Sequence, residues 1–111
     1  MQAPTFHNDD DAARYYLSVL RDGADADKIV ARERLAAVFE RRGMFAEAVE
    51  LYERNVRTGV HTADLLARLS DAYRQIGDNG SADAALAEAR RLHAAQAAAA
   101  PRRCRDMPSA P

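Results

Sequence analysis

The 111-residue sequence contains one cysteine, Cys104, no tryptophan and only 6% aromatic residues. A single cysteine excludes an intramolecular disulfide and a cysteine-rich metal site. The scarcity of rings means that a folded core must depend on Leu, Val, Ile, Ala and a few aromatic side chains. No apolar run approaches the ~20 residues of a membrane-spanning helix, so no membrane span is expected. The first residues lack the basic and apolar regions of a secretory signal, and we expect a cytoplasmic protein.

The sequence also lacks an excess of charge of either sign. Sixteen Lys and Arg residues stand against seventeen Asp and Glu residues, which gives a net charge of −1 and a pI near 6.3. Proteins that bind nucleic acid or membrane surfaces through bulk charge carry a basic face and a high pI. This balance of charge argues against nucleic acid as a partner. Lys28 is the only lysine, and this arginine and alanine bias is typical of a GC-rich, bacterial coding sequence.

No catalytic or metal-binding constellation is visible in the sequence. His7, His61 and His93 lie far apart, and none has a second histidine or a carboxylate at ligand spacing. Cys104 lies between two arginines, which favour thiol reactivity, but the segment around it offers no partner residue. We therefore interpret it as an incidental thiol. The sequence predicts a protein that is not an enzyme and needs no cofactor.

A sequence repeat with a period of 34 residues is the strongest pattern present. Shifting the chain by 34 positions matches five residues with five others of the same class. The matched pairs are Leu35 with Leu69, Phe39 with Tyr73, Gly43 with Gly77, Ala48 with Ala82, and Tyr52 with Leu86. Each unit is typical of a helix, a tight turn and a second helix, because apolar residues recur every three or four positions on both sides of the glycine.

The predicted elements follow from this pattern. Helices are expected over 32–42 and 45–58, over the segment after a Thr62 N-cap, and over a last segment that continues toward Pro101. A first helix, capped by Asn8 or Asp9 and ended by Gly23, matches the second half of a unit at a shift of 36 and leaves a loop over 23–27. The helix that follows Thr62 is expected to bury a stripe of apolar residues, namely Leu65, Leu66, Leu69, Ala72, Tyr73 and Ile76.

These elements predict a single helical domain over residues 9–99, with a flexible N-terminus over 1–8 and a disordered tail over 100–111. The tail is rich in proline, low in hydrophobic residues and without a period. Its arginines, Arg102, Arg103 and Arg105, are interpreted as solvated charges. A regulatory thiol or a nucleic-acid function of this tail is a third, minor hypothesis.

The spacing Leu-x3-Phe/Tyr-x3-Gly followed by Ala-x3-Tyr/Leu resembles the tetratricopeptide repeat. The resemblance covers repeat one over 29–59, repeat two over 63–96 and a half repeat over 9–23. It implies an all-α fold of about five antiparallel helices in a short right-handed superhelix. Arg32 and Leu66 replace the family's early aromatic residue, Asn79 replaces a ring, and the closing proline is absent. The signature residues that the resemblance places in the core or turns are Leu35, Phe39, Gly43, Ala48, Tyr52, Leu69, Tyr73, Gly77, Ala82 and Leu86.

The resemblance also implies a concave groove lined by the first helix of each repeat. The residues that fall on this groove are Val30, Glu33, Arg34, Ala37, Glu40, Asp64, Ala67, Arg68, Asp71 and Arg74. A family groove that clamps a C-terminal carboxylate needs Lys and Asn, whereas this chain has Glu33, Ala67, Ala37 and Asp71 at those places. Such a clamp is disfavoured. The arginines are candidate anchors for a partner, and the alternative is that these residues are solvated charges with an internal Asp64–Arg68 pair.

Two functions remain as hypotheses. The first is a non-catalytic protein-interaction module that binds a segment of another protein in the groove. The second is a structural or assembly subunit that oligomerises through its terminal helices, since two and a half repeats are fewer than the three that usually form a stable stack. The small residues of 82–99, with Ala84, Ala85 and Ala87 expected on the surface, are the candidate face for self-association.

Overall fold

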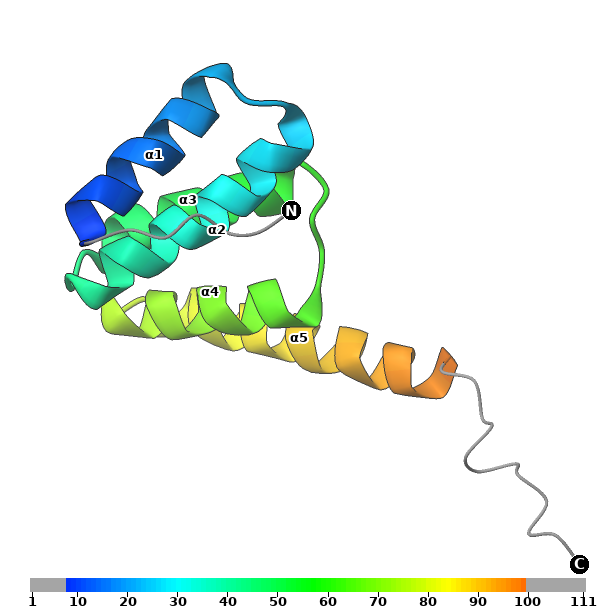
Figure 1. The fold of residues 1–111 in the computed structure, drawn as a ribbon. Helices are drawn as coiled ribbons and strands as arrows, with labels where there is room; N and C mark the ends of the chain where they lie inside the picture. Colours follow the sequence, from blue (N-terminus) through cyan, green and yellow to red (C-terminus); the bar gives the residue numbers. More distant parts are fainter. Residues whose placement is uncertain (1–7, 100–111) are drawn as a thin grey trace, which may run out of the picture.

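A computed structural model of the chain describes residues 8–99, which form five α-helices and no strand (Figure 1). The helices are α1 (Asp9–Asp22), α2 (Asp25–Arg41), α3 (Phe45–Arg57), α4 (Ala63–Gln75) and α5 (Asn79–Ala99). None of these five helices combines the length and the apolarity that crossing a membrane requires. The predicted all-α fold with five helices is therefore confirmed. The segments predicted to be flexible or disordered, 1–7 and 100–111, lie outside the described residues.

Three of the helices begin at a side chain that satisfies a free backbone amide. The Asn8 side chain accepts a hydrogen bond from the amide of Asp11 at 2.9 Å, and Thr62 Oγ1 accepts one from Leu65 at 3.1 Å. Both N-caps are those that the sequence predicts. Asp78 Oδ1 serves α5 in the same way and accepts from the amide of Ser81 at 3.1 Å. Such caps stabilise a helix because its first amides have no partner within the helix.

The turns after α2 and α4 have the same geometry, one repeat period apart. Gly43 and Gly77 have φ angles of 75° and 83°, in the left-handed region that glycine adopts readily. The following amide donates to the carbonyl five residues back in both turns, at 2.8 Å from Met44 to Phe39 and at 2.9 Å from Asp78 to Tyr73. This is the Schellman arrangement, which satisfies the free carbonyls at a helix end.

Replacing Gly77 by alanine is expected to lower the free energy of unfolding by about 1–2 kcal/mol, because an L-residue is strained at positive φ. Nothing lies within 4 Å of the added Cβ atom, so the cost is conformational only. Gly80 is the matched control, since it lies in the first turn of α5 without positive φ. Gly80→Ala is expected to stabilise by about 0.5–1 kcal/mol. Urea denaturation of both variants checks the pair, and equal shifts would contradict the turn assignment.

The second helix begins earlier than the sequence pattern indicates. A loop over 23–27 is expected from the sequence, but α2 starts at Asp25 and leaves only Gly23 and Ala24 between helices. Asp25 and Asp27 lie in the first turn of α2, where their carboxylates complement the positive end of the helix dipole. The acidic segment that the sequence suggests is a solvated loop therefore forms the first turn of α2.

The core is built where successive helices pack, α1 on α2, α2 on α3, α3 on α4, and α4 on α5. One buried cluster has members on α2, α3, α4 and α5, and a second has members on α1 and α2. Phe39 and Leu51 pack against both clusters and make them continuous. The first cluster consists of Ala36, Ala48, Val49, Tyr52, Leu65, Leu66, Leu69, Ala72 and Ala89, and the second of Ala12, Tyr16, Ala31, Leu35 and Val38.

Two expectations about the buried faces are wrong. Ile76, predicted within the buried stripe, is 44% exposed because α4 ends at Gln75 and Ile76 is its C-cap. Ala85, predicted on the surface, is buried at 8% exposure. Ala85 lies three residues after Ala82 and four before Ala89, so these three buried alanines form one face of α5.

Two buried polar side chains join neighbouring helices. Asn55 of α3 donates from Nδ2 to the carbonyl of Ile29 at 3.0 Å and accepts from Arg32 at 3.2 Å. Ser70 of α4 donates from Oγ to the carbonyl of Ala82 at 2.7 Å. Both side chains are almost fully buried, so these bonds fix the register of α3 against α2 and of α5 against α4.

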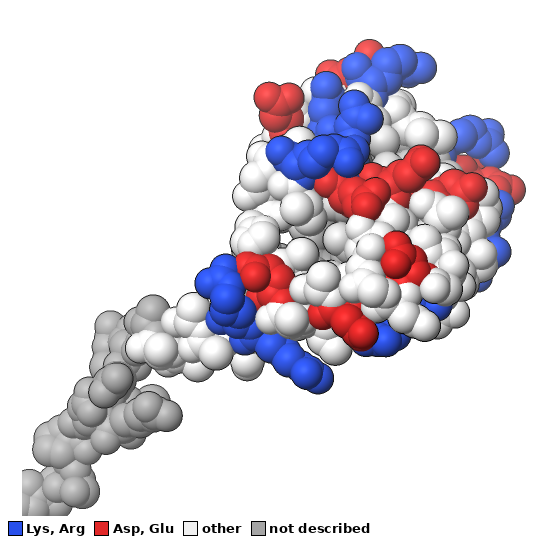
Figure 2. Space-filling view, turned by 180° about the vertical axis from the view of Figure 1, so that it is seen from behind, with Lys and Arg blue, Asp and Glu red and all other residues white. Residues whose placement is uncertain are grey.

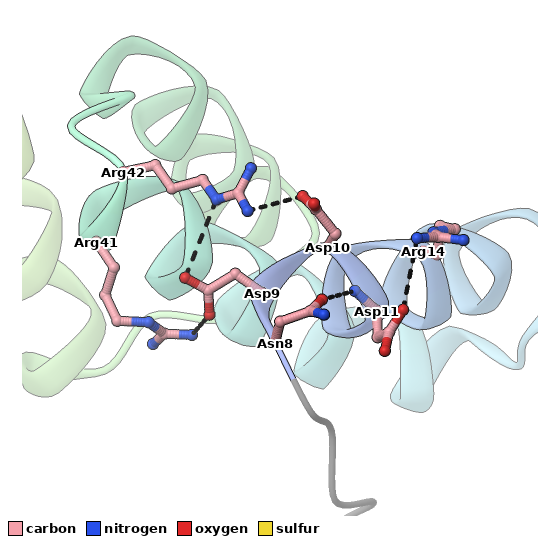
Figure 3. A network of polar contacts seen from close by, with 7 residues as sticks. All are labelled: Asn8, Asp9, Asp10, Asp11, Arg14, Arg41 and Arg42. Carbon is pink, nitrogen blue, oxygen red and sulfur yellow. Dashed lines mark hydrogen bonds and ion pairs between the residues drawn. The ribbon is translucent and has the colours of Figure 1, made fainter.

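The start of α1 is bound to the end of α2 by ion pairs (Figure 3). Arg41 lies 2.8 Å from Asp9, and Arg42 lies 2.7 Å from Asp10. The hydrogen bond from Arg41 lowers the pKa of Asp9 below its usual value. These pairs are exposed and stabilise only modestly. They also place acids at a helix N-terminus and bases at a C-terminus, as the helix dipoles favour.

Candidate functional site

A hollow of about 140 Å³ lies between the C-terminal half of α4 and the ends of α2 and α3 that face it. We refer to it as the α2–α4 hollow. It brings together Glu40 from α2 with Arg68 and Asp71 from α4, three of the ten residues predicted for a groove. Its other lining residues are Phe45, Ala72 and Gln75.

The direction of the helices explains why only these predicted residues come together. Figure 1 shows that α2 and α4 approach each other at their C-terminal ends and diverge toward their N-terminal ends. Glu40 lies in the last turn of α2, where the two helices approach, and it is next to the second half of α4. The earlier residues of α2 predicted for the groove line neither this hollow nor the second one described below. They are Val30 and Arg34, which are exposed, and Glu33 and Ala37, which are partly buried.

Charge in the α2–α4 hollow favours a cationic ligand. Its two carboxylates, Glu40 and Asp71, face one guanidinium, that of Arg68. Arg68 is already paired within α4, because its Nε lies 3.3 Å from Asp64 Oδ2. This is the internal Asp64–Arg68 pair that the sequence leaves open as an alternative. Glu40 and Asp71 therefore leave this hollow with an excess of negative charge.

A buried tyrosine hydroxyl lies beside these charges. Tyr52 of α3 is fully buried, and its hydroxyl has no hydrogen-bond partner among the described residues. Burial raises the pKa of Tyr52 to about 12, and the nearby Glu40 charge contributes in the same direction. The sequence pattern assigns Tyr52 to the core but gives no sign that its polar atom is left unpaired. The charged groups nearest to this hydroxyl, Glu40 and Arg68, both line the α2–α4 hollow.

Stability is expected to fall as the pH rises from about 10 to about 12. Burial raises the pKa of both Tyr52 and Tyr73 to about 12, and the Tyr73 hydroxyl also donates to Glu53. The unfolded chain, whose tyrosines ionise near pH 10, loses these protons first and becomes relatively more favourable. Urea midpoints measured between pH 8 and about pH 12 check this. A Tyr52→Phe/Tyr73→Phe variant should show a flatter profile, and an equally steep profile would contradict the account.

A second hollow, of about 510 Å³, lies between α4 and α5. We refer to it as the α4–α5 hollow. Two residues predicted for the groove, Asp64 and Ala67, lie here rather than beside α2. Its other lining residues are Ala63, Leu86, Ala89, Arg90, His93, Ala94 and Gln96. The last predicted groove residue, Arg74, pairs with Asp83 of α5 at 2.9 Å.

The signature residues occupy buried and turn positions. Leu35, Ala48, Tyr52, Leu69 and Ala82 are buried, and Phe39, Tyr73 and Leu86 are partly buried. Gly43 and Gly77 occupy the two Schellman turns described above.

The histidines of the described residues lie apart. His61, between α3 and α4, contacts Glu88 of α5 at 3.0 Å, and His93 lines the α4–α5 hollow. Hydrogen bonds from Arg91 and then His61 lower the pKa of Glu88 to about 2. Within residues 8–99 no group of three or more His, Cys, Asp or Glu side chains could hold a metal ion. The contact between His61 and Glu88 therefore links the α3–α4 loop to α5.

The face turned away from the viewer in Figure 1 is acidic at its middle. Figure 2 shows Asp and Glu side chains across the centre of this face and most Lys and Arg side chains toward its edges. An acidic surface attracts basic segments at distances comparable to the Debye length of ~10 Å.

Comparison of the chain with models of known protein families and with curated proteins finds no match. The tetratricopeptide resemblance therefore depends on the residues quoted for it in the sequence alone.

Proposed function

We propose that this chain is a non-catalytic protein-interaction module of tetratricopeptide-like architecture, which binds a segment of another protein. The binding site in this proposal is the α2–α4 hollow, with Glu40 and Asp71 as its principal contacts. The observation that carries the proposal is that residues predicted for a groove from two separate helices meet there. The two Schellman turns 34 residues apart, at Gly43 and Gly77, support the repeat architecture.

The electrostatics of the hollow favour this function over that of a passive surface. Carboxylates beside an apolar wall formed by Phe45 and Ala72 bind a side chain that is charged at its tip and apolar along its stem. Phe45 is partly buried and lines the hollow. Interfaces commonly depend on a few such anchors.

The test is a pull-down from a lysate of the source organism with charge-reversed variants. Asp71→Arg is expected to reduce the recovered partner about tenfold or more, since it replaces an attractive by a repulsive charge. Glu50→Arg is the matched control, because Glu50 is exposed on α3 and lines neither hollow. Equal recovery with both variants would exclude the α2–α4 hollow as the binding site.

An assembly subunit that pairs with a second copy through its terminal helices is the alternative proposal. It is favoured by the α4–α5 hollow, whose wall contains Ala63, Ala67, Leu86 and Ala89. Ala94→Glu tests it, because Ala94 is exposed and lines this hollow, whereas Ala85 is buried. If the wild type has the mass of an oligomer in solution and Ala94→Glu has the mass of a monomer, the result would favour the alternative.

A further inference from the structure

The α4–α5 hollow leaves an apolar surface uncovered at one end of the helix stack. All of its lining residues come from α4 and α5, the last two helices of the described chain. Its volume of about 510 Å³ equals the liquid volume of roughly 17 water molecules, so it can hold several residues of an extended segment. Stacked helical units bury their apolar faces against the next unit, and the last unit needs a cover with a polar outer side.

The unpaired charge in this hollow is positive. Asp64, the acid among its lining residues, is paired with Arg68 at 3.3 Å. The Arg90 side chain is exposed and forms no ion pair or hydrogen bond with another side chain of residues 8–99. His93, one turn further along α5, adds a group that is positive when it is protonated. These charges and the alanine and leucine walls favour an occupant with one acidic and one apolar side chain.

The sequence after α5 supplies both side chains. Asp106 is followed by Met107, and an unbranched methionine side chain fills irregular apolar gaps. Arg90 is nine residues before Ala99, the last residue of α5, and therefore roughly 14 Å from it along the helix axis at ~1.5 Å per residue. Asp106 is seven residues after Ala99 and can extend up to about 24 Å from it. The segment is therefore long enough to reach Arg90 of its own chain.

Covalent connection favours this segment over a second copy or a foreign protein. A short connection gives an attached segment an effective concentration of about 1 mM at a site within its reach. A separate protein at micromolar concentration competes poorly with it. Pro101 does not continue a helix, which favours a change of direction close to the end of α5. Arg102, Arg103 and Arg105 would give such a cover the polar outer side that the end of a stack requires.

We propose that the segment after α5 folds back onto the α4–α5 hollow of its own chain, with Asp106 paired to Arg90 and Met107 between the alanines. This inference goes beyond the proposed function, because it concerns a different hollow. A covered α4–α5 hollow is also closed to a second copy, so the segment opposes the self-association of the alternative proposal.

Cross-linking within one chain tests this inference, because the only natural thiol, Cys104, lies close to Asp106 and Met107 in the sequence. Ala63→Cys adds a second thiol on the α4 wall of the hollow. A bifunctional maleimide is expected to join the two thiols, and linked peptides recovered from the monomer band of a denaturing gel identify the product. Asp106→Arg or Met107→Ser is expected to slow this reaction about tenfold, and Arg90→Asp to restore the rate of the Asp106→Arg variant. Circular dichroism verifies that all variants keep their helix content.

Equal rates with the natural and the substituted segments would overturn the inference, because a segment that does not bind cross-links through its covalent connection alone. Linked peptides found only in a dimer band would overturn it as well, since they assign the contact to a second copy. Failure of either kind is distinguishable from failure of the proposed function, because the pull-down with Asp71→Arg tests only the α2–α4 hollow.

Hydrogen exchange provides a second measurement that needs no added cysteine. Met107→Ser is expected to speed the exchange of the α5 amides of residues 93–98 about threefold, because the exposed side chains there lose their cover. Unchanged exchange over these residues would contradict the inference.

Discussion

Replacing Tyr52 by alanine is expected to lower the free energy of unfolding by about 3–5 kcal/mol, the usual cost of deleting a large core ring. Tyr52 is the largest fully buried side chain, and it packs in the cluster that joins α2, α3, α4 and α5. Deleting its ring therefore leaves a cavity within this cluster. Urea denaturation followed by circular dichroism at neutral pH measures the change.

Tyr52→Phe separates the ring from the hydroxyl. Because the hydroxyl is buried without a partner in the described part of the chain, its removal is expected to leave stability unchanged or to raise it by up to about 1 kcal/mol. A loss for Tyr52→Phe as large as that for Tyr52→Ala would show that the hydroxyl forms an essential bond.

Replacing Ala48 by leucine is the second large expected effect, a loss of about 1–3 kcal/mol through overpacking. Ala48 of α3 has no exposed surface, as is also true of Ala36 of α2 and Ala82 of α5. Small side chains at these places let neighbouring helices approach closely, and a leucine forces α3 away from its neighbours. The melting temperature and the urea midpoint should both fall.

Ala46→Leu is the matched control, because Ala46 lies on the exposed side of the same helix. Its effect is expected to stay within about 0.5 kcal/mol, as for most surface substitutions. Equal losses for the two variants would indicate that leucine affects α3 generally. Close packing at Ala48 would then not explain the result.

The helix count and most helix ends could be predicted from the sequence because they depend on local chemistry. Asn8 and Thr62 cap helices through their own side chains, and Gly43 and Gly77 end helices because glycine tolerates positive φ. The start of α2 could not be predicted in this way, because aspartates such as Asp25 are common both in loops and at helix N-termini. Composition alone does not distinguish these two uses of aspartate.

The buried polar residues were missed, although one of them carries a detectable signal. Asn55 lies three residues after Tyr52 and seven after Ala48, so its spacing places it on the buried face of α3. Its bonds to Ile29 and Arg32 depend on how α3 packs against α2, which no local pattern encodes.

The candidate site could be predicted only in part because it depends on the angle between α2 and α4. The sequence places Glu40 and Asp71 on the expected faces of their helices, and both line the α2–α4 hollow. It assigns Asp64 and Ala67 to the same groove, whereas they line the α4–α5 hollow. Helix crossing is set by the packing of many side chains at once, so periodicity within one helix does not determine it.

The most direct test of the central claim, that the α2–α4 hollow is the binding surface, is site-specific photo-crosslinking. Gln75 and Gln96 are a matched pair, because both are exposed glutamines and each lines one hollow. A photoreactive residue at position 75 is expected to capture the bound partner protein, and one at position 96 is not. Capture at position 96 alone would contradict the account and transfer the function to the α4–α5 hollow.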